Sequence, residues 1–276
     1  MTKTKVLKYV TTTVFLMIAV TMTLPFLWML SASFKVEADV FKFPVEWIPS
    51  RWNIIANYSE VWGGRYSFAL FYFNSIKITV LTTLCQVIVS VMGAYAFAKI
   101  KFKFRNVLFI LYLSMMMIPD QMTIVPKFMI FRWLNIYDTH LGLILLGSFS
   151  IYGMFLLKQY MMSISDALSE SAQIDGAGHF RIFMQIIVPM TKPAIVTLMI
   201  LKFVWTWNDY QNPLVFLSTE SLFTIQQGMT KFMTEYTSYY SLIMVAAVCS
   251  TIPLIIVFLI GQKYVLEGIA VGAVKG

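Results

Sequence analysis

The side chains that could carry out acid–base, nucleophilic or metal chemistry are few in this sequence, and they lie far apart. The chain has two histidines, His140 and His179, and two cysteines, Cys85 and Cys249. Neither histidine has a second metal ligand at a useful spacing, and no CxxC pair occurs. No Ser/His/Asp or paired-carboxylate arrangement can be assembled. These patterns predict neither a metal site nor a catalytic site, and we expect that the chain is not an enzyme.

Three ionisable residues interrupt otherwise apolar stretches: Asp120, Lys202 and Asp209. A charge at the centre of a bilayer costs about 2.5–3.5 kcal/mol on insertion scales, so each of these residues needs a physical explanation. An unbroken helix would carry Lys202 and Asp209 nearly on one face, two turns apart, with Thr206 between them. One interpretation is a structural ion pair that Lys202 makes with Asp120 or Asp209.

The other interpretation is that this polar stripe lines a path for a polar cargo, where aromatic rings could stack on sugar rings. The candidate path residues are Asp120, Lys202, Trp205, Thr206, Asp209 and Tyr210, with Trp207 as a further stacking candidate. Both interpretations stay open on the sequence alone.

The composition indicates which elements must hold these residues. Hydrophobic residues make up 59% of the 276 residues and charged residues only 12%, with a mean hydropathy of +0.74. Soluble globular chains typically contain about 45–50% apolar and about 25% charged residues. A disordered chain, a secreted disulfide scaffold and an ordinary cytosolic enzyme are therefore excluded. The composition predicts an integral membrane protein.

Six apolar segments are long enough to cross the hydrocarbon core, which takes about 20 residues of helix. The predicted spans are residues 10–30, 76–98, 107–130, 141–160, 194–217 and 242–264. The first is too long for the hydrophobic region of a signal peptide, which has about 7–15 residues, so we expect an uncleaved span. The prediction is an all-α integral membrane protein, with residues 1–276 as a single transmembrane domain.

The distribution of Lys and Arg predicts the orientation of these spans. Lys99, Lys101, Lys103 and Arg105 lie between the second and third spans with no acid among them, so this loop should be cytoplasmic. Both termini are then cytoplasmic, with twelve basic residues inside and seven outside. The +8 net charge is explained by this topology better than by nucleic-acid binding, which we do not expect.

The longest predicted cytoplasmic loop, residues 161–193, is called the elbow here. Ser163 and Asp166 resemble a capping box at the start of a short helix over residues 166–174. Gly176 can end that helix in the left-handed conformation, and a second helix is expected from about His179 until Pro189 breaks it. Small side chains on the first helix would let another surface approach its backbone closely.

The elbow closely resembles the EAA loop of ABC-importer permeases, whose pattern is roughly E-A-A, then D-G-A, then an apolar stretch ending in L-P. The matching residues are Glu170-Ser171-Ala172, Asp175-Gly176-Ala177 and Val188-Pro189. Shorter matches extend over nearly the whole chain, among them Pro25-Phe26-Leu27-Trp28, Met117-Ile118-Pro119, Trp207-Asn208-Asp209 and Gly272-Ala273-Val274-Lys275-Gly276. Together they resemble the second permease subunit of bacterial carbohydrate importers, the group that contains one maltose-transporter permease.

This resemblance implies a type I ABC-importer permease fold and a role in coupling. In the family, the EAA loop is a coupling helix that sits in a cleft of a cytoplasmic ATPase. The residues implied to make this contact are Glu170, Ser171, Ala172, Asp175, Gly176, Ala177 and Pro189, with Lys275 and Gly276 of the tail. The sequence has no G-x-x-x-x-G-K-[ST] phosphate loop, so ATP and Mg are expected on a partner ATPase and no cofactor on this chain.

The resemblance further implies a subunit that forms half of the translocation pathway of an ATP-driven sugar or oligosaccharide importer in the bacterial cytoplasmic (inner) membrane. The implied partners are a homologous permease, a cytoplasmic ATPase dimer, an extracytoplasmic solute-binding protein, the cargo and the lipid bilayer. Lys202 stands where the family usually has an uncharged residue, which favours an acidic saccharide as cargo. The main alternative is a non-ABC secondary transporter that uses intramembrane acids for ion coupling.

Overall fold

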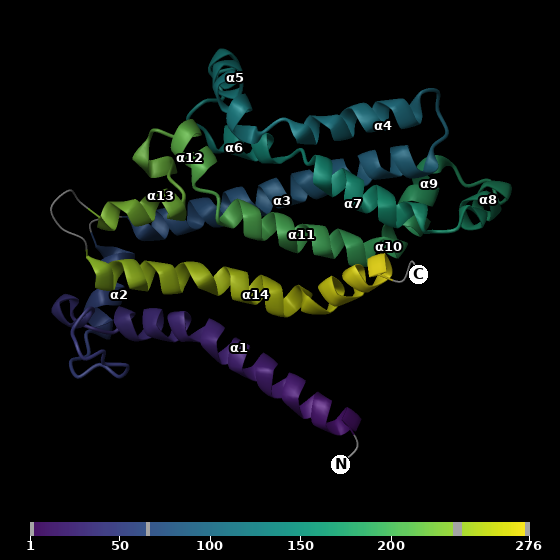
Figure 1. Cartoon of the computed structure of the whole chain (residues 1–276). Helices are drawn as coiled ribbons and strands as arrows, with labels where there is room; N and C mark the ends of the chain where they lie inside the picture. The colour runs from purple at the N-terminus through teal and green to yellow at the C-terminus, as the bar shows by residue number, and fades with distance from the viewer. Residues whose placement is uncertain (1–2, 65–66, 234–238, 274–276) are drawn as a thin grey trace. The chain divides into compact units, whose positions relative to one another are not determined.

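The computed structural model describes residues 3–64, 67–233 and 239–273 (Figure 1). Regular structure in these ranges is helical, and the β-type pairing found there is one isolated bridge between Lys35 and Trp52. This confirms the all-α prediction for the described residues. The helices are α1 Lys3–Ser33, η1 Glu37–Asp39, α2 Ile54–Gly63, α3 Phe68–Lys99, α4 Arg105–Ser114, η2 Met115–Met117, α5 Asp120–Trp133, α6 His140–Gly147, α7 Ile151–Met162, α8 Asp166–Ile174, α9 His179–Ile182, η3 Phe183–Ile187, α10 Val188–Met190, α11 Lys192–Trp207, α12 Gln211–Phe216, η4 Glu220–Leu222, α13 Ile225–Met229, η5 Thr230–Phe232 and α14 Tyr240–Ala273.

Three continuous helices are long and apolar enough to cross a membrane. Their qualifying stretches are Leu7–Ser33 of α1, Phe68–Lys99 of α3 and Tyr240–Tyr264 of α14. These coincide with the first, second and sixth predicted spans. Three further candidates are pairs of shorter helices joined at a bend, so the described residues hold three spans, or up to six if each bent pair is one span.

The predicted third span is not one helix, because the chain bends by 100° between α4–η2 and α5. Ile118 has an extended conformation, with φ of −84° and ψ of 115°, and Pro119 follows it. A proline disfavours the helical conformation at the residue before it, which is why the helix stops here. The predicted span of residues 107–130 therefore consists of two helices that meet at Pro119.

The fourth predicted span also bends, and the fifth is shorter as a helix than predicted. α6 and α7 meet at 42°, and the hydroxyl of Ser150 caps α7 by accepting from the amide of Gly153 at 3.0 Å. α11 follows the α9–α10 segment at 73° and ends at Trp207, so it does not reach residue 217 as predicted. Residues 211–216 form the separate helix α12.

The chain groups into two compact units, residues 1–70 with 228–252 and residues 71–227 with 253–276. In the second unit, buried apolar side chains gather where α3, α7, α9–η3 and α11 meet, and Figure 1 shows α7 and α11 running beside α3. Leu157, Met161 and Ile187 are fully buried there. This core holds the elbow against the carboxyl end of α3.

The first unit contains α1, α2 and the start of α14, joined by polar contacts. The carboxylate of Glu37 accepts hydrogen bonds from the amides of Tyr240 and Ser241 at 2.9 and 2.8 Å, which caps α14. Arg51 donates two hydrogen bonds to Asp39, and this contact lowers the pKa of Asp39. These bonds fix the segment that connects α1 to α2.

One segment of the second unit, residues 217–226, is fastened by side chains from distant parts of the sequence. The carboxylate of Asp138 accepts from the amides of Ser218 and Thr219 at 2.8 and 3.0 Å, and from the Thr219 hydroxyl at 2.6 Å. Burial by itself would raise the pKa of Asp138, but the hydrogen bonds from Thr219 and Ser218 outweigh it and lower the pKa to about 2.

We expect Asp138→Asn to loosen this segment, because the neutral amide keeps one acceptor but loses the charge that strengthens three hydrogen bonds. For a partly exposed carboxylate the loss should be about 1 kcal/mol, seen as roughly fivefold faster hydrogen exchange at the amides of Ser218 and Thr219.

The pH dependence and a matched variant test this assignment. The contribution of Asp138 is fully present above its ordinary pKa of 3.8 and is lost as the pH falls toward the folded value of about 2. Asp120→Asn is the control, since that exposed carboxylate makes a 3.3 Å contact with Lys127 and does not cap the segment. Equal exchange in both variants would contradict the assignment.

Candidate coupling site

The first helix of the elbow, α8, spans Asp166–Ile174 as predicted. Its amino-terminal cap differs from the prediction: the Ser165 hydroxyl accepts from the amide of Ala167 at 3.3 Å. The hydroxyl of Ser163 donates instead to the carbonyl of Tyr160, at the end of α7. Ser163 is still in the last turn of the preceding helix, so its side chain cannot reach the start of α8.

The carboxyl end of α8 is a Schellman motif. The amide of Ala177 donates to the carbonyl of Ala172 at 2.9 Å, and the amide of Gly176 to that of Gln173 at 3.0 Å. Gly176 has a φ of 80°, which a side chain would disfavour, so the prediction of a left-handed glycine stop is confirmed. Gly178 has an ordinary φ of −74°.

The second half of the elbow is not broken at Pro189. α9 passes into the π-helix η3 and then into α10, and the segment ends at Met190. The amide of Val188 bonds the carbonyl of Phe183, five residues back, so the widened turn accommodates a proline that has no amide to donate. The bend to α11 follows at Thr191, whose amide and hydroxyl both donate to the carbonyl of Ile187.

The end of α3 holds both halves of the elbow in place. The ammonium of Lys99, with its side chain only 5% exposed, donates to the carbonyl of Ile164 and to the carboxylate of Asp166, both at 2.6 Å. This contact lowers the pKa of Asp166. The hydroxyl of Tyr95, one turn earlier, donates to the carbonyl of His179 at 3.2 Å. The sequence alone indicated Lys99 only as a topology signal.

The outer surface of α8 carries the residues that the sequence selected, with two additions. Glu170, Ser171, Asp175 and Gly176 are exposed, whereas Ala172 and Ala177 pack inward against the core. Apolar side chains that the sequence analysis overlooked share the exposed surface: Ile174 is 87% exposed and Leu168 is 43% exposed. Large apolar residues on an otherwise polar helix were the signal that could have identified them.

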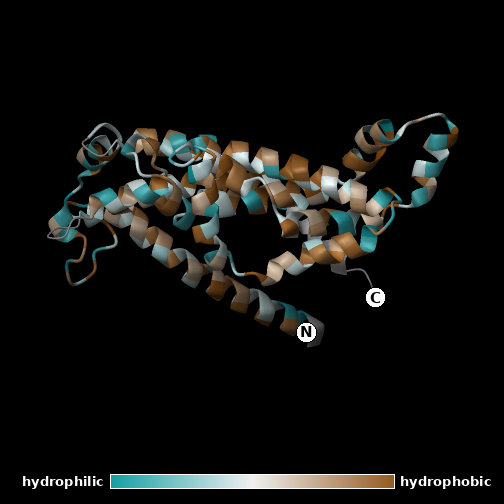
Figure 2. Ribbon diagram, turned by 90° about the horizontal axis from the view of Figure 1, so that it is seen from above, coloured by the Kyte–Doolittle hydropathy of each residue, from teal (hydrophilic) through white to brown (hydrophobic). Residues whose placement is uncertain are grey.

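Acidic and apolar groups therefore lie together on a short helix that protrudes from the core. Figure 2 shows hydrophilic and hydrophobic residues side by side on the elbow. Such a surface can dock into a groove that offers apolar contacts and a basic rim. Lys275 and Gly276, the other predicted contact residues, lie outside the described residues.

The predicted polar stripe around Lys202 is only partly assembled. Asp209 lies beyond the end of α11, where its carboxylate accepts from the amide and side chain of Asn212 at 3.1 and 2.7 Å. Asp120 is exposed at the start of α5 and contacts Lys127. Neither acid forms a salt bridge with Lys202 in the described part of the chain, so the direct ion pair of the first interpretation is not formed, although Asp209 is close enough to attract Lys202.

The aromatic candidates also differ from one another. Trp205 and Tyr210 are exposed, and Trp205 lies 5.9 Å from Tyr152 between ring centroids. Trp207 is buried, stacks on Phe203 and is part of the hydrophobic core. Lys202 remains half-buried on α11, with its ammonium beside Gly147.

A polar face of α3, which the sequence analysis missed, lies against this region. Its members are all buried: Thr79, Thr82, Thr83, Gln86 and Ser90. A side chain at Gly147 would meet both Thr82 and Lys202, and one at Gly153 would meet Gln86 and Ser90. Glycine therefore lets the α6–α7 segment approach this face closely. The helical spacing of these residues in an apolar run was the available signal.

Several buried polar atoms on this face of α3 and on α11 have no hydrogen-bond partner in the described ranges. They are the hydroxyl oxygens of Thr82, Thr83 and Thr206 and the side-chain carbonyl of Gln86. Among the described residues no group of three His, Cys, Asp or Glu is placed to hold a metal ion. Together with Lys202, the unpaired atoms could bind a polar or anionic ligand within the bundle.

Residues 86–271 match the family described as the inner membrane component of binding-protein-dependent transport systems. The chain belongs to this family. Its fold is that of a type I ABC-importer permease, and the permease is a membrane transport component rather than an enzyme. Membership excludes the alternative of a non-ABC secondary transporter.

Known relatives match over nearly the whole chain. A probable ABC transporter permease protein of Bacillus subtilis, YurM, is 34% identical, over 91% of this chain and 83% of the relative. The arabinooligosaccharide permease protein AraQ of the same organism is 30% identical, over 95% of this chain and 94% of the relative. A crystal structure of a bacterial ABC transporter that imports the acidic polysaccharide alginate contains a chain with 26% identity and a TM-score of 0.84. That match covers 96% of this chain and 98% of the other.

We expect Lys99→Met to loosen α8 in the permease, because it removes the donor of two bonds and leaves the Ile164 carbonyl unpaired. Hydrogen exchange at the α8 amides should be about tenfold faster, which corresponds to about 1.4 kcal/mol for charge-assisted bonds. Asp166→Asn should have a smaller effect, since Lys99 keeps an acceptor at each site.

Lys77→Met is the control, since it removes an exposed cation near the opposite end of α3, away from the elbow. Unchanged exchange in Lys99→Met would mean that the core alone positions the elbow. The Asp166 contribution should be present above the ordinary pKa of 3.8 and decline as the pH falls through the lower folded value.

Proposed function

We propose that the permease is a transmembrane subunit of an ATP-driven importer of sugars or oligosaccharides and forms half of its translocation pathway. It pairs with a homologous permease, and a cytoplasmic ATPase dimer that binds ATP and Mg drives both. An extracytoplasmic solute-binding protein delivers the cargo, in keeping with the binding-protein-dependent family to which the chain belongs. Similarity to permeases for arabinooligosaccharides and for alginate supports a saccharide cargo.

The proposed topology has six spans in the cytoplasmic membrane, with both termini inside. The bent pairs α4–α5 and α6–α7 then each count as one crossing, and α11 of the third pair supplies another, with α9–α10 belonging to the elbow. The contact between Lys99 and Asp166 supports this arrangement, because it places the basic loop of residues 99–105 and the elbow at the same end of α3. The excess of positive charge in that loop favours the cytoplasmic side for both.

The observation that carries the coupling proposal is the geometry of α8. The helix protrudes, exposes Glu170 and Asp175 beside Ile174, and is fixed at its base by Lys99. A projection that is exposed at its tip and anchored at its base can transmit a push from a docked ATPase into the core. The left-handed turn at Gly176 lets the chain reverse directly beneath this tip.

Lys202 supports an acidic saccharide as the cargo. Its ammonium lies beside the polar face of α3 and forms no salt bridge with a described acid, although Asp209 is close enough to attract it. A cation inside the membrane without a directly bonded counter-ion suits a carboxylate that arrives with the cargo. Similarity to a transporter of the acidic polysaccharide alginate is in line with this assignment.

Gly176→Asp should leave membrane insertion intact but uncouple ATP hydrolysis from uptake. Aspartate at a φ of 80° strains the Schellman turn, and its charge and bulk hinder close approach of the ATPase. Gly178→Asp is the matched control, because it adds the same side chain at an ordinary φ, where nothing lies within 4 Å.

Uptake and ATPase activity of the assembled transporter in proteoliposomes provide the measurement. We expect uptake to fall at least about tenfold in Gly176→Asp while ATP hydrolysis continues, which corresponds to a loss of about 1.4 kcal/mol of coupling. Uptake and hydrolysis should both persist in Gly178→Asp. Normal uptake in Gly176→Asp would overturn the coupling assignment. ATPase activity of this chain alone would overturn the proposed function.

Lys202→Met should reduce uptake of acidic oligosaccharides more than uptake of neutral ones. A hydrogen bond to a charged group contributes about 1.5–3 kcal/mol, so a loss of roughly tenfold or more is expected for alginate oligosaccharides. Arabinooligosaccharide uptake serves as the neutral comparison, and Lys77→Met removes an exposed cation of α3 as a control. Equal loss for both sugars, together with poor assembly, would instead assign Lys202 a structural role.

A further inference from the structure

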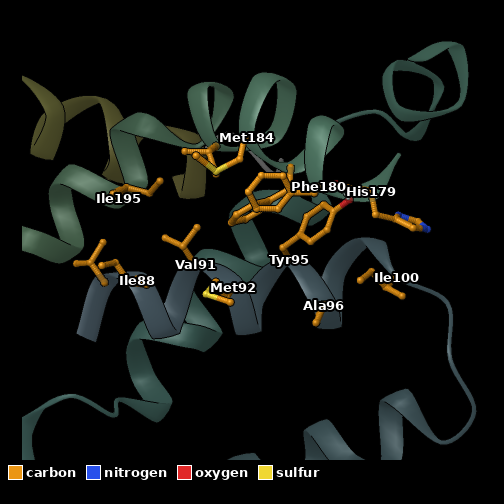
Figure 3. A pocket seen from close by; sticks show the side chains of 13 residues that line it. Ile88, Val91, Met92, Tyr95, Ala96, Ile100, His179, Phe180, Met184 and Ile195 are labelled. Atoms are coloured by element: carbon orange, nitrogen blue, oxygen red, sulfur yellow. Dashed lines mark hydrogen bonds between the residues drawn. The ribbon is translucent and has the colours of Figure 1, made fainter. Parts of the chain in front are cut away.

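An apolar groove runs along α3 on the side that faces the elbow (Figure 3). It has a volume of about 590 Å³ and extends from Ile88 to Ile100. Twelve residues of helix at about 1.5 Å each give a length of about 18 Å. The hydrocarbon of one leaflet is about 15 Å thick, half of the full core, so the groove is as long as one leaflet is deep.

The lining of the groove favours an alkyl chain over a sugar. Met92 and Ile88 on α3 are 59% and 58% exposed, and Phe180 and Met184 on the opposite wall are also exposed. The hydroxyl of Tyr95 already donates to the carbonyl of His179. Aliphatic and aromatic surface thus dominates, and flexible methionines can adapt to a chain of variable shape.

A cluster of positive charge begins where the groove ends. Ile100 lines the groove, and the guanidinium of Arg105 donates to the Ile100 carbonyl at 3.2 Å. Lys101, Arg105 and Asn106 line a second pocket of about 310 Å³, and the exposed Lys103 lies beside it in the sequence. Lys101, Lys103 and Arg105 form no salt bridge in the part of the chain that the structure describes, although Asp166 lies nearby.

We propose that these two pockets form one binding site for an anionic phospholipid of the cytoplasmic leaflet. An acyl chain occupies the groove from Ile88 to Ile100, and the headgroup phosphate contacts Lys101 in the second pocket and is attracted by the neighbouring Lys103. The assignment of the leaflet rests on the proposed orientation. Basic pockets beside membrane helices bind anionic headgroups through this combination of charge and apolar contact.

The charge cluster argues for a lipid rather than a helix of a partner permease as the occupant. An apolar helix would fill the groove but would leave uncompensated cations at its end, whereas a phospholipid satisfies both parts. The bound lipid would support the elbow, because one wall of the groove is formed by α9 and η3. Its loss should therefore loosen the segment through which the ATPase acts.

The test counts phosphatidylglycerol molecules retained by the purified, assembled transporter in native mass spectrometry. The double variant Lys101→Gln/Lys103→Gln should bind phosphatidylglycerol about thirtyfold more weakly, as expected for two cations at a membrane surface. The matched double variant Lys5→Gln/Lys8→Gln removes two exposed cations near the amino terminus and should bind as the wild type does. Arg105 is left unchanged because of its bond to Ile100.

A second pair of variants tests the groove itself. Met92→Trp should displace the acyl chain and reduce retention, whereas Met117→Trp, at an exposed position outside the groove, should not. Phosphatidylcholine should be retained poorly by every form. Equal phosphatidylglycerol retention by the two lysine double variants, or cross-linking of Met92→Cys to the partner permease, would overturn the proposal. Lipid retention is measured without transport. A failed uptake test of the proposed function would therefore leave the lipid-binding result unaffected.

Discussion

A backbone amide or carbonyl in hydrocarbon has no water to bond, so each break in a membrane helix must be closed by other groups of the protein. The bends of this permease follow that constraint. The Ser150 hydroxyl accepts an amide at the start of α7, and the Thr191 amide and hydroxyl close the end of α10. At Pro119 the ring has no amide to satisfy. Bends therefore occur where proline or a hydroxyl residue removes the cost of interrupting a helix.

The same constraint explains how the elbow can protrude and still be firmly held. Where α3 ends, its last turn would leave carbonyls open, and the elbow begins beside it. Lys99 stabilises both parts. Its positive charge in the last turn interacts favourably with the negative end of the α3 dipole, and its ammonium donates to the Ile164 carbonyl and to Asp166 of the elbow. The proposed coupling helix is thus bonded to the core through one buried side chain.

Much of this could be predicted from the sequence because its signals are local. Apolar length located α1, α3 and α14, and the Gly176 stop located the end of α8, since a left-handed turn needs glycine. The proline that causes the bend at Pro119 is also visible in the sequence, but the span was predicted from the length of the apolar run alone. The Lys202 ion pair failed for a different reason. The pairing with Asp209 needed α11 to continue to that residue, whereas α11 ends at Trp207 and the Asp209 carboxylate accepts from the amide and side chain of Asn212, three residues on.

The contacts that matter most for function are those that no local pattern specifies. Lys99 and Asp166 are 67 residues apart, and Asn74 bonds the carbonyls of Ser221 and Phe223 at a still greater separation. Coupling between a docking surface and a distant path requires such long-range bonds, because a helix transmits force only as far as it is straight. In the proposed coupling, motion of the elbow would reach α11 through the 73° bend and α3 through Lys99. The Lys99 contact is the more direct of the two routes, since it passes to the continuous helix that carries the polar face.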